Sequence, residues 1–364
     1  MIYPRRMLIL AEGKFSPLRS KTANGAVAFM PERVVGVVDS TCSGTTAGAV
    51  LGYGGAIPVV ASILDGLRLQ PDSLLIGIAP PGGRLPNEWR GFVREALSGG
   101  LHVISGLHTL LADDAEFAGM AADHGVEIWD LRRVPEENRR VSRGNWRTRK
   151  SRTILTVGTD CKIGKMTTIL RVFEEFRHRG LRSDFIGTGQ TGILIRGRGV
   201  SVDAVVGDYI AGSVEHEIDR SEAEGYEYVF VEGQGALTHQ GYSSVTLGLM
   251  HGTMPDAMIL VHQPTRLEDD YGFPLPDLRR LIAQHEEMVN FFRPTKVVAI
   301  GLNSVGLTDE QSREAAQHIE ETTGLPAVDA FRFGAARLAD AVFGFLKEAP
   351  PCKYVGQFRY PGMS

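Results

Sequence analysis

The residues with the clearest chemistry lie in one run, TVGTDCKIGKMTT, from Thr156 to Thr168. An apolar segment typical of a strand precedes the run, and apolar residues at helical spacing follow it. A strand, a glycine loop and a helix start form a phosphate cradle, because loop N–H groups and the helix N-terminus point at the anion. Lys165 adds a mobile positive charge. We therefore expect the following residues to bind the phosphates of a ligand: Gly158, Thr159, Asp160, Cys161, Lys162, Ile163, Gly164, Lys165, Met166 and Thr167.

This loop departs from the common phosphate-loop pattern in two ways. Five residues separate Gly158 from Gly164, where the pattern has four, and Met166 stands where a Ser or Thr hydroxyl usually binds Mg²⁺. One helical residue turns the chain by about 100°, so Thr167 does not simply replace that hydroxyl. The ligand is thus either ATP or a pyrophosphate such as that of coenzyme A, which needs no tightly held Mg²⁺. A glycine-rich turn without a ligand is the remaining alternative.

Candidate catalytic groups follow a second apolar run, YVFVEGQG, which ends in Glu232 and two glycines. An acid at the carboxyl end of a parallel strand faces the phosphate loop of the same sheet, where it can hold a cation, orient water or accept a proton. His239, in the segment that follows, is the histidine best placed for general-base work at neutral pH. Asp203 and Asp208 flank the start of the next predicted helix, and each either caps the helix or serves a cation or an amine. We select Glu232, His239 and Asp208 as catalytic candidates. No metal ion is expected; if Mg²⁺ binds, Asp203, Asp208 and Glu232 are its predicted ligands.

Further polar residues suit ligand binding. The run GTGQTG contributes Gln190 and Thr191 to a predicted substrate site. Asn303 follows a late strand, where many phosphate-loop proteins contact a nucleotide base; otherwise it serves a turn. Cys161 lies within the phosphate loop, where a helix N-terminus can lower the pKa of a thiol, or it serves packing. No Ser–His–Asp or Cys–His arrangement can be assigned from the sequence.

Composition limits the class of protein. The chain has 364 residues, of which 43% are hydrophobic and 23% charged, and its formal net charge is −4. This balance gives no sign of a nucleic-acid partner. We find no apolar run of membrane-spanning length and no signal-peptide pattern, and the three cysteines form no CxxC pair. A cytoplasmic protein with a small-molecule substrate is expected. The basic run from Arg147 to Lys150 is interpreted as a solvated linker.

The alternation of apolar runs and helical segments predicts an α/β protein with two parallel-sheet domains, residues 1–145 and 146–364. The first is Rossmann-like, although no GxGxxG indicates a dinucleotide, and the second is P-loop NTPase-like. Strands are predicted at 6–10, 34–38, 74–78, 102–104, 126–129, 153–157, 184–186, 228–231, 257–261, 296–300 and 327–329. Helices are predicted at 45–51, 89–97, 112–124, 166–179, 208–224, 275–291, 309–323 and 334–346. The tail from Pro350 is expected to be irregular.

The second domain resembles dethiobiotin synthetase. Its GTDCKIGK loop, the EGQG strand end and Asn303 are similar to that family's GTDxxxGKT loop, EGAGG strand end and base-binding asparagine. Met166 departs from the pattern at the metal-binding hydroxyl. This resemblance implies a ligase or kinase that uses ATP and Mg²⁺ on a small carboxylate.

A second resemblance covers nearly the whole chain. The runs VVDS, GTTAG, GTDC, GKMTT, GTGQTG and EGQG are similar, in this order, to the two-domain DgcN-like D-glutamate N-acetyltransferase family. The resemblance implies acetyl transfer from acetyl-CoA to the amino group of D-glutamate. We also expect a homo-oligomer. Lys162 and Lys165 would then hold the CoA phosphates, and the candidates to pair with the substrate carboxylates are Arg84, Arg196, Arg198 and Arg266. The base would be His239, Glu232 or an aspartate. A nucleotide-binding regulator without enzymatic activity is a further alternative.

Overall fold

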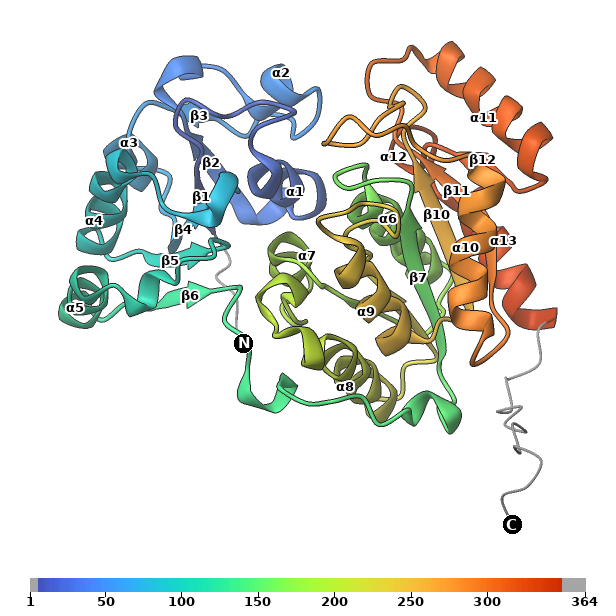
Figure 1. Ribbon diagram of the computed structural model, residues 1–364. Helices are drawn as coiled ribbons and strands as arrows, with labels where there is room; N and C mark the ends of the chain where they lie inside the picture. Colours follow the sequence, from blue (N-terminus) through green and yellow to red (C-terminus); the bar gives the residue numbers. More distant parts are fainter. Residues whose placement is uncertain (1–5, 349–364) are drawn as a thin grey trace. The chain divides into compact units, whose positions relative to one another are not determined.

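The computed structural model describes residues 6–348 and divides the chain into two compact units (Figure 1). The N-terminal unit comprises Met1–Val134 and Gly189–Ala204, and the C-terminal unit comprises Pro135–Thr188 and Val205–Ser364. The chain therefore enters the C-terminal unit at residue 135 and returns once to the N-terminal unit. The single boundary predicted at residue 145 includes neither the crossing at residue 135 nor the return of Gly189–Ala204 to the N-terminal unit. The predicted irregular tail lies outside the described residues.

The N-terminal unit is built on a six-stranded parallel sheet with strand order β3-β2-β1-β4-β5-β6. This is the doubly wound order of Rossmann-like folds, as the sequence predicted. Helices α1 and α7 pack together over one apolar core, and α4 and α5 lie over the core of the opposite face. The bounds are β1 Met7–Leu10, α1 Lys21–Phe29, β2 Val34–Val38, α2 Ala47–Leu51, β3 Val59–Val60, α3 Ile63–Leu67, β4 Ser73–Ile76, α4 Arg90–Ser98, β5 His102–Ser105, α5 Ala115–His124, β6 Ile128–Asp130 and α7 Gln190–Arg196.

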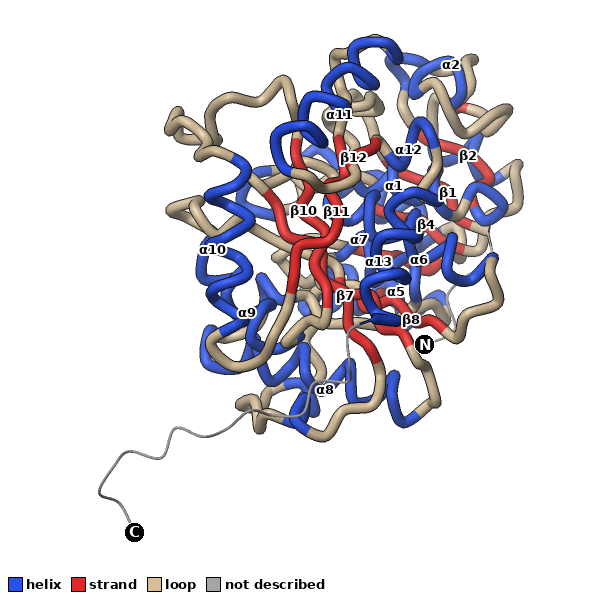
Figure 2. Tube along the Cα trace, turned by 90° about the vertical axis from the view of Figure 1, so that its right-hand side faces the viewer, coloured by secondary structure: helices blue, strands red, loops and turns tan. Residues whose placement is uncertain are grey.

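The C-terminal unit carries a second six-stranded parallel sheet, with order β12-β11-β10-β7-β9-β8. Helices α6, α12 and α13 cover one face, while α8, α9 and α10 cover the other (Figure 2). The α/β class with two parallel sheets is thus confirmed. The bounds are β7 Arg152–Gly158, α6 Lys165–His178, β8 Ser183–Ile186, α8 Ile210–Ala223, β9 Tyr228–Val231, α9 Ser243–Thr253, β10 Ala257–His262, α10 Leu278–Asn290, β11 Lys296–Leu302, α11 Asp309–Thr323, β12 Ala327–Val328, α12 Ala330–Phe333 and α13 Ala336–Glu348.

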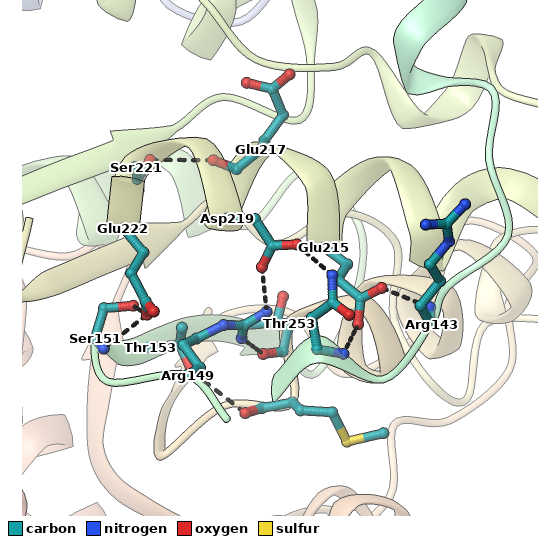
Figure 3. A network of polar contacts seen from close by, with 12 residues as sticks. Arg143, Arg149, Ser151, Thr153, Glu215, Glu217, Asp219, Ser221, Glu222 and Thr253 are labelled. Carbon is teal, nitrogen blue, oxygen red and sulfur yellow. Dashed lines mark hydrogen bonds and ion pairs between the residues drawn. The ribbon is translucent and has the colours of Figure 1, made fainter. Parts of the chain in front are cut away.

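The segment from residue 135 to β7 is fastened to α8 and is no solvated linker (Figure 3). Glu215 accepts hydrogen bonds from the backbone N–H groups of Arg143 and Asn145, both at 2.7 Å. The side chain of Arg149 is only 2% exposed; it donates to the carbonyl oxygen of Thr253 at 2.8 Å and lies 3.7 Å from the Asp219 carboxylate. The interpretation of this basic run as solvated was therefore wrong for Arg149, which has partners on helices far away along the chain, whereas Arg147, Thr148 and Lys150 are exposed.

Several short helices were missed. Helix α1 has no acidic residue in its first turn and no basic residue in its last turn, and it contains a glycine, so its sequence carries few helix signals. Helices α7 and α9 directly follow polar, glycine-rich segments and were not among the predicted helices. In both cases packing against a neighbouring helix, α1 for α7 and α8 for α9, stabilises the helical conformation. A local sequence pattern does not show such contacts.

Candidate active site

The phosphate loop connects β7, a central strand of the second sheet, to α6 (Figure 1). Gly164 has φ +98° and Lys162 has φ +58°, so the loop turns through two left-handed residues before the helix begins. The Lys165 side chain is 6% exposed, and its Nζ donates to the carbonyl oxygen of Asp160 at 2.7 Å. A Cβ on Gly158 would lie 3.0 Å from that Nζ. The loop therefore folds closely around its lysine.

Two cations balance the acidic residues beside the loop. Asp160 is fully buried; its carboxylate accepts from the N–H of Cys161 at 2.6 Å and lies 2.6 Å from Nε of Arg266. Arg266 also pairs with Asp270 at 2.5 Å, and Lys162 pairs with Asp270 at 3.0 Å. The Asp270 hydrogen bond raises the pKa of Lys162, whose side chain stays 69% exposed. The two loop lysines thus differ: Lys165 lies inside the loop and Lys162 at the surface.

Glu232 follows β9, the neighbour of β7, at the expected edge of the sheet. It is 2% exposed, and its carboxylate accepts from the N–H of Thr188 at 3.0 Å and from the Gln234 amide at 3.1 Å. A Cβ on Gly233 would lie 1.8 Å from a β7 carbonyl oxygen and 3.2 Å from Cδ of Lys165. The glycine therefore brings the Glu232 strand end directly against the phosphate loop.

His239 lies near the same loop and is 1% exposed. Its Nδ1 accepts from the N–H of Gly241 at 3.2 Å, its Nε2 has no hydrogen-bond partner, and its ring stacks with Tyr242 at 4.8 Å. Ligand-type atoms of Asp160, Cys161 and His239 lie within 4.8 Å of one another, which makes them a buried trio with metal-ligand chemistry. Among the residues that the structure describes, no other group of three histidines, cysteines or acids lies that close. The sequence separation of Cys161 and His239 hid this proximity.

Burial changes how the cysteine and a second histidine behave. Burial raises the pKa of the Cys161 thiol to about 11. The positive charge of nearby Lys165 lowers this pKa, but by less than burial raises it. The thiol therefore remains protonated at neutral pH, contrary to the lowered pKa considered for a helix N-terminus. Burial also lowers the pKa of His262 to about 4, and its Nδ1 lies 3.2 Å from Oγ1 of Thr159. His262 thus supports the loop as a neutral ring.

The remaining loop residues confirm that no hydroxyl stands at the position after the lysine. Met166 is buried, Thr167 is half-buried, and the buried Thr168 packs against Gly301, where a Cβ would lie 2.5 Å from its methyl carbon. Asn303 directly follows β11, and its Cβ lies 3.6 Å from the position of a Cβ on Gly164. Asn303 is therefore beside the phosphate loop, as a contact to the ligand requires.

The predicted substrate-binding residues belong to the N-terminal unit. Gln190 is 6% exposed and accepts from Nη2 of Arg132 at 2.8 Å, while Oγ1 of the neighbouring Thr191 is buried without a hydrogen-bond partner. Arg84 is exposed and Arg196 half-buried. Arg132 was missed, because no motif marks an arginine that follows a strand.

Asp203 and Asp208, two of the residues predicted to ligate Mg²⁺ if it binds, lie in different environments. Asp203 belongs to the N-terminal unit, where it pairs with Arg132 and accepts from Oγ of Ser201 at 2.8 Å. Asp208 belongs to the C-terminal unit and is exposed just before α8, which has no side-chain cap. Neither acid therefore caps that helix.

Within the C-terminal unit, the geometry offers a cationic phosphate loop, a buried carboxylate at a strand end and a buried imidazole with one unmet polar atom. This combination suits transfer of an acyl group from a donor that carries phosphates, since the chemistry needs anion binding, a proton acceptor and a hydrogen-bond donor. No helix in the described part of the chain is both long and apolar enough to cross a membrane.

Comparison with known proteins gives matches to both units. Residues 140–339 match a family described as "Domain of unknown function (DUF1611_C) P-loop domain", and residues 40–134 match "Domain of unknown function (DUF1611_N) Rossmann-like domain". A protein of Tritonibacter scottomollicae named D-glutamate N-acetyltransferase is 37% identical over 331 residues, which are 89% of this chain and 94% of that protein. A Pseudoalteromonas protein of the same name is 33% identical over 276 residues, 75% of this chain and 82% of that protein.

A solved structure extends the similarity to the fold of the whole chain. The crystal structure of a DUF1611 family protein from Anabaena variabilis is 36% identical and has a TM-score of 0.88, covering 93% of this chain and 99% of that one. The predicted order of a Rossmann-like and a P-loop domain and the predicted family resemblance are confirmed by these matches.

Proposed function

Because the chain belongs to the DUF1611 family of two-domain proteins, we propose that it transfers an acetyl group from acetyl-CoA to the amino group of D-glutamate. The observation that carries this proposal is the 37% identity, over 89% of the chain, to a protein named D-glutamate N-acetyltransferase. The same name on the Pseudoalteromonas relative supports it independently.

The phosphate loop supports acetyl-CoA as the donor. Lys165 and the loop N–H groups offer charge and hydrogen bonds to a pyrophosphate, and Asn303 lies where it can contact the nucleotide portion. Met166 supplies no hydroxyl for Mg²⁺, and acetyl transfer requires no phosphoryl chemistry. Binding of the donor through its phosphates is therefore compatible with the unusual loop.

In this reaction the substrate nitrogen forms a bond to the thioester carbonyl carbon, and the carbon–sulfur bond breaks. The nitrogen loses a proton and the CoA sulfur leaves, taking up a proton as the free thiol. We assign the proton acceptor to Glu232, because two donors orient its buried carboxylate beside the loop. Asp208 is the alternative proton acceptor. Its carboxylate is exposed, so it is held less firmly in one orientation than the buried carboxylate of Glu232.

Assignment of the D-glutamate carboxylates stays a prediction. Gln190, Thr191, Arg84 and Arg196 remain the candidates from the N-terminal unit. The unmet hydroxyl of the buried Thr191 is the feature among them that most calls for a ligand.

The test is to incubate the purified protein with acetyl-CoA and D-glutamate, with and without ATP and Mg²⁺, and to quantify free CoA and ADP separately by chromatography. We expect CoA release that depends on D-glutamate and not on ATP. L-glutamate serves as the control for the acceptor's chirality, and a Glu232→Gln variant as the control for contaminating activity.

Two outcomes would refute the proposal. ADP release without CoA release would place the protein with ATP-dependent ligases or kinases, as the dethiobiotin synthetase resemblance implies. Tight nucleotide binding without turnover of any acid would indicate a regulator.

A further inference from the structure

Arg132 is buried just beyond the carboxyl end of β6, in the N-terminal unit. Its Nε donates to the carbonyl oxygen of Gly106 at 2.7 Å, directly after β5. Its Nη1 donates to Oγ of Ser201 at 3.3 Å and pairs with Asp203, and its Nη2 donates to Oε1 of Gln190 at 2.8 Å. One guanidinium group therefore joins a strand end to the first residue of α7 and to the segment that follows α7.

The contact with Arg132 fixes the orientation of the Gln190 amide. A guanidinium group has donors only, so the amide turns its oxygen toward Nη2 and its NH2 group away. Gln190 is 6% exposed, and among the residues that the structure describes its NH2 group has no hydrogen-bond acceptor. A Cβ on Gly106 would lie 2.6 Å from Cγ of Gln190, so glycine leaves the room that this side chain needs. Arg132 thus makes Gln190 a buried side chain that can donate but not accept.

The next residue adds a second polar group without a partner. Thr191 is 2% exposed, and its Oγ1 has no hydrogen-bond partner in the described part of the chain. Buried polar groups in folded proteins are nearly always hydrogen-bonded, and exceptions call for an explanation. Doubly wound sheets bind ligands beyond the carboxyl ends of their strands, where Gly106 and Arg132 lie. Two adjacent residues with unused hydrogen-bonding groups at this edge indicate a ligand that accepts hydrogen bonds.

The charge and exposure of the cluster favour a carboxylate as this ligand. Asp203 pairs with Arg132, so the cluster carries no large positive charge of the kind that a polyphosphate requires. Nε2 of His108 lies 3.8 Å from the Asp203 carboxylate, and the two side chains are 46% and 41% exposed, so the cluster is open to solvent on that side. A carboxylate accepts hydrogen bonds at both oxygens, whereas an ammonium group would bring its N–H donors against the NH2 group of Gln190.

We propose that the NH2 group of Gln190 donates to a carboxylate of the acceptor amino acid, with the Thr191 hydroxyl as a second donor. Arg132 is the positioning residue, because it binds the amide oxygen and leaves only the donor for the substrate. The identity of the acceptor rests on the proposed transfer to D-glutamate. The site itself rests on the hydrogen bonds and the burial of Arg132, Gln190 and Thr191.

The experiment separates the donor from the residue that orients it. Gln190→Glu keeps the length of the side chain and an oxygen for Arg132 but removes the NH2 group. Arg132→Met, Gln190→Met and the double variant complete a double-mutant cycle. Arg133→Met is the matched control, because Arg133 is the next residue, is 50% exposed and pairs with Asp113.

For each protein, isothermal titration gives the Kd of D-glutamate, of D-glutamine and of glutarate, with and without CoA. Glutarate has both carboxylates of glutamate but no amino group, so its binding requires no turnover. The KM values of D-glutamate and acetyl-CoA are measured in parallel, and thermal unfolding verifies folding.

We expect Gln190→Glu to raise the Kd of D-glutamate and of glutarate by about 10- to 150-fold, as loss of a hydrogen bond to a charged group does. Arg132→Met should raise both Kd values by at least about threefold when Gln190 is present, but by less than about twofold in the Gln190→Met background. The KM of acetyl-CoA should change by less than about twofold in every variant, and Arg133→Met should match the wild type. A loss that D-glutamine shares with D-glutamate assigns the site to the α-carboxylate, and a loss with D-glutamate alone assigns it to the γ-carboxylate.

Three results would overturn the site. The first is an unchanged Kd of D-glutamate and glutarate in folded Gln190→Glu. The second is an equal effect of Arg132→Met with and without Gln190, which would show that Arg132 does not act through the amide. The third is a rise in the KM of acetyl-CoA as large as that of D-glutamate, which would indicate a general structural role.

The outcome for this site and the outcome for the proposed function are distinguishable. If the wild type releases no CoA with D-glutamate while Gln190→Glu still weakens glutarate binding, acetyl transfer is refuted and the carboxylate site stands. If the wild type is active and Gln190→Glu keeps the wild-type KM of D-glutamate, the site is refuted and the proposed function stands.

Discussion

Replacement of Lys165 by methionine tests whether the phosphate loop binds the donor by its phosphates. Lys165 is 6% exposed and its Nζ bonds to the Asp160 carbonyl oxygen at 2.7 Å, within the loop itself. Methionine keeps the length of the stem and removes only the charged donor. The matched variant is Lys162→Met, since Lys162 lies in the same loop but is 69% exposed and paired with Asp270.

The structure sets different magnitudes for the two lysines. A hydrogen bond from a buried ammonium group to a phosphate contributes about 1.5–3 kcal/mol. Lys165→Met should therefore weaken CoA binding by about 10- to 150-fold, at about 1.4 kcal/mol per factor of ten. An exposed lysine contributes at most about 1 kcal/mol, so Lys162→Met should cost less than about fivefold.

The assay compares two acetyl donors, so that an effect on phosphate binding is separated from an effect on acetyl transfer. Isothermal titration gives the Kd of CoA, and kcat/KM is measured with acetyl-CoA and with acetyl-pantetheine, which has the same thioester end but none of the nucleotide phosphates. We expect Lys165→Met to lower kcat/KM for acetyl-CoA and to leave that for acetyl-pantetheine nearly unchanged. Thermal unfolding verifies that the loop still folds.

An equal loss with both donors would show that Lys165 acts on the acetyl group or on folding and would refute the reasoning. So would an unchanged Kd in Lys165→Met, or a loss in Lys162→Met as large as that in Lys165→Met.

Three further predictions concern stability and reactivity. Asp219→Ala should lower the free energy of unfolding by about 1–3 kcal/mol, because it removes the acid that pairs with the buried charge of Arg149. Arg149→Met removes that charge and should lower the free energy of unfolding less. Urea denaturation that gives the reverse order would contradict this. Gly233→Ala should destabilise by at least about 1–3 kcal/mol, since its Cβ would lie 1.8 Å from a main-chain oxygen, whereas Gly119→Ala, in an exposed helical position with open space, should be neutral or stabilising by the same measurement. The raised pKa of Cys161, about 11, means that the folded state holds its proton longer than the unfolded state, so this contribution to stability is complete below pH 9 and is lost as pH rises to about 11. Unfolding measured at a series of pH values should show a loss of stability between pH 9 and about 11 that is larger in the wild type than in Cys161→Ala.

Long, periodic elements were predictable from the sequence because their own residues carry the signal. The strand that ends at Gly158 and the helix that begins at Lys165 were placed within one residue, and helix α11, Asp309–Thr323, has the predicted bounds. Its Thr308 capping box marks the start locally. Short helices such as α7 lack such signals, and it is packing beside α1 that places α7 in the N-terminal unit.

For the candidate site, residues at the carboxyl ends of strands could be placed from topology alone. Parallel strands order their ends along one edge, so Glu232 and Asn303 beside the phosphate loop follow from the motif positions. The differing environments of Lys162 and Lys165 could not be foreseen, because they depend on Asp270, which lies more than 100 residues away in the chain.

The sequence by itself determined the alternation of strands and helices, the phosphate loop and the family, because each is written in the type and spacing of neighbouring residues. Only the tertiary structure decided which polar atoms are buried and which partners they meet. The tertiary structure brings His239 close to Cys161, places Asp219 beside Arg149 and raises the pKa of the Cys161 thiol. Burial and hydrogen bonding arise from contacts between segments far apart in the chain, and no local pattern records them.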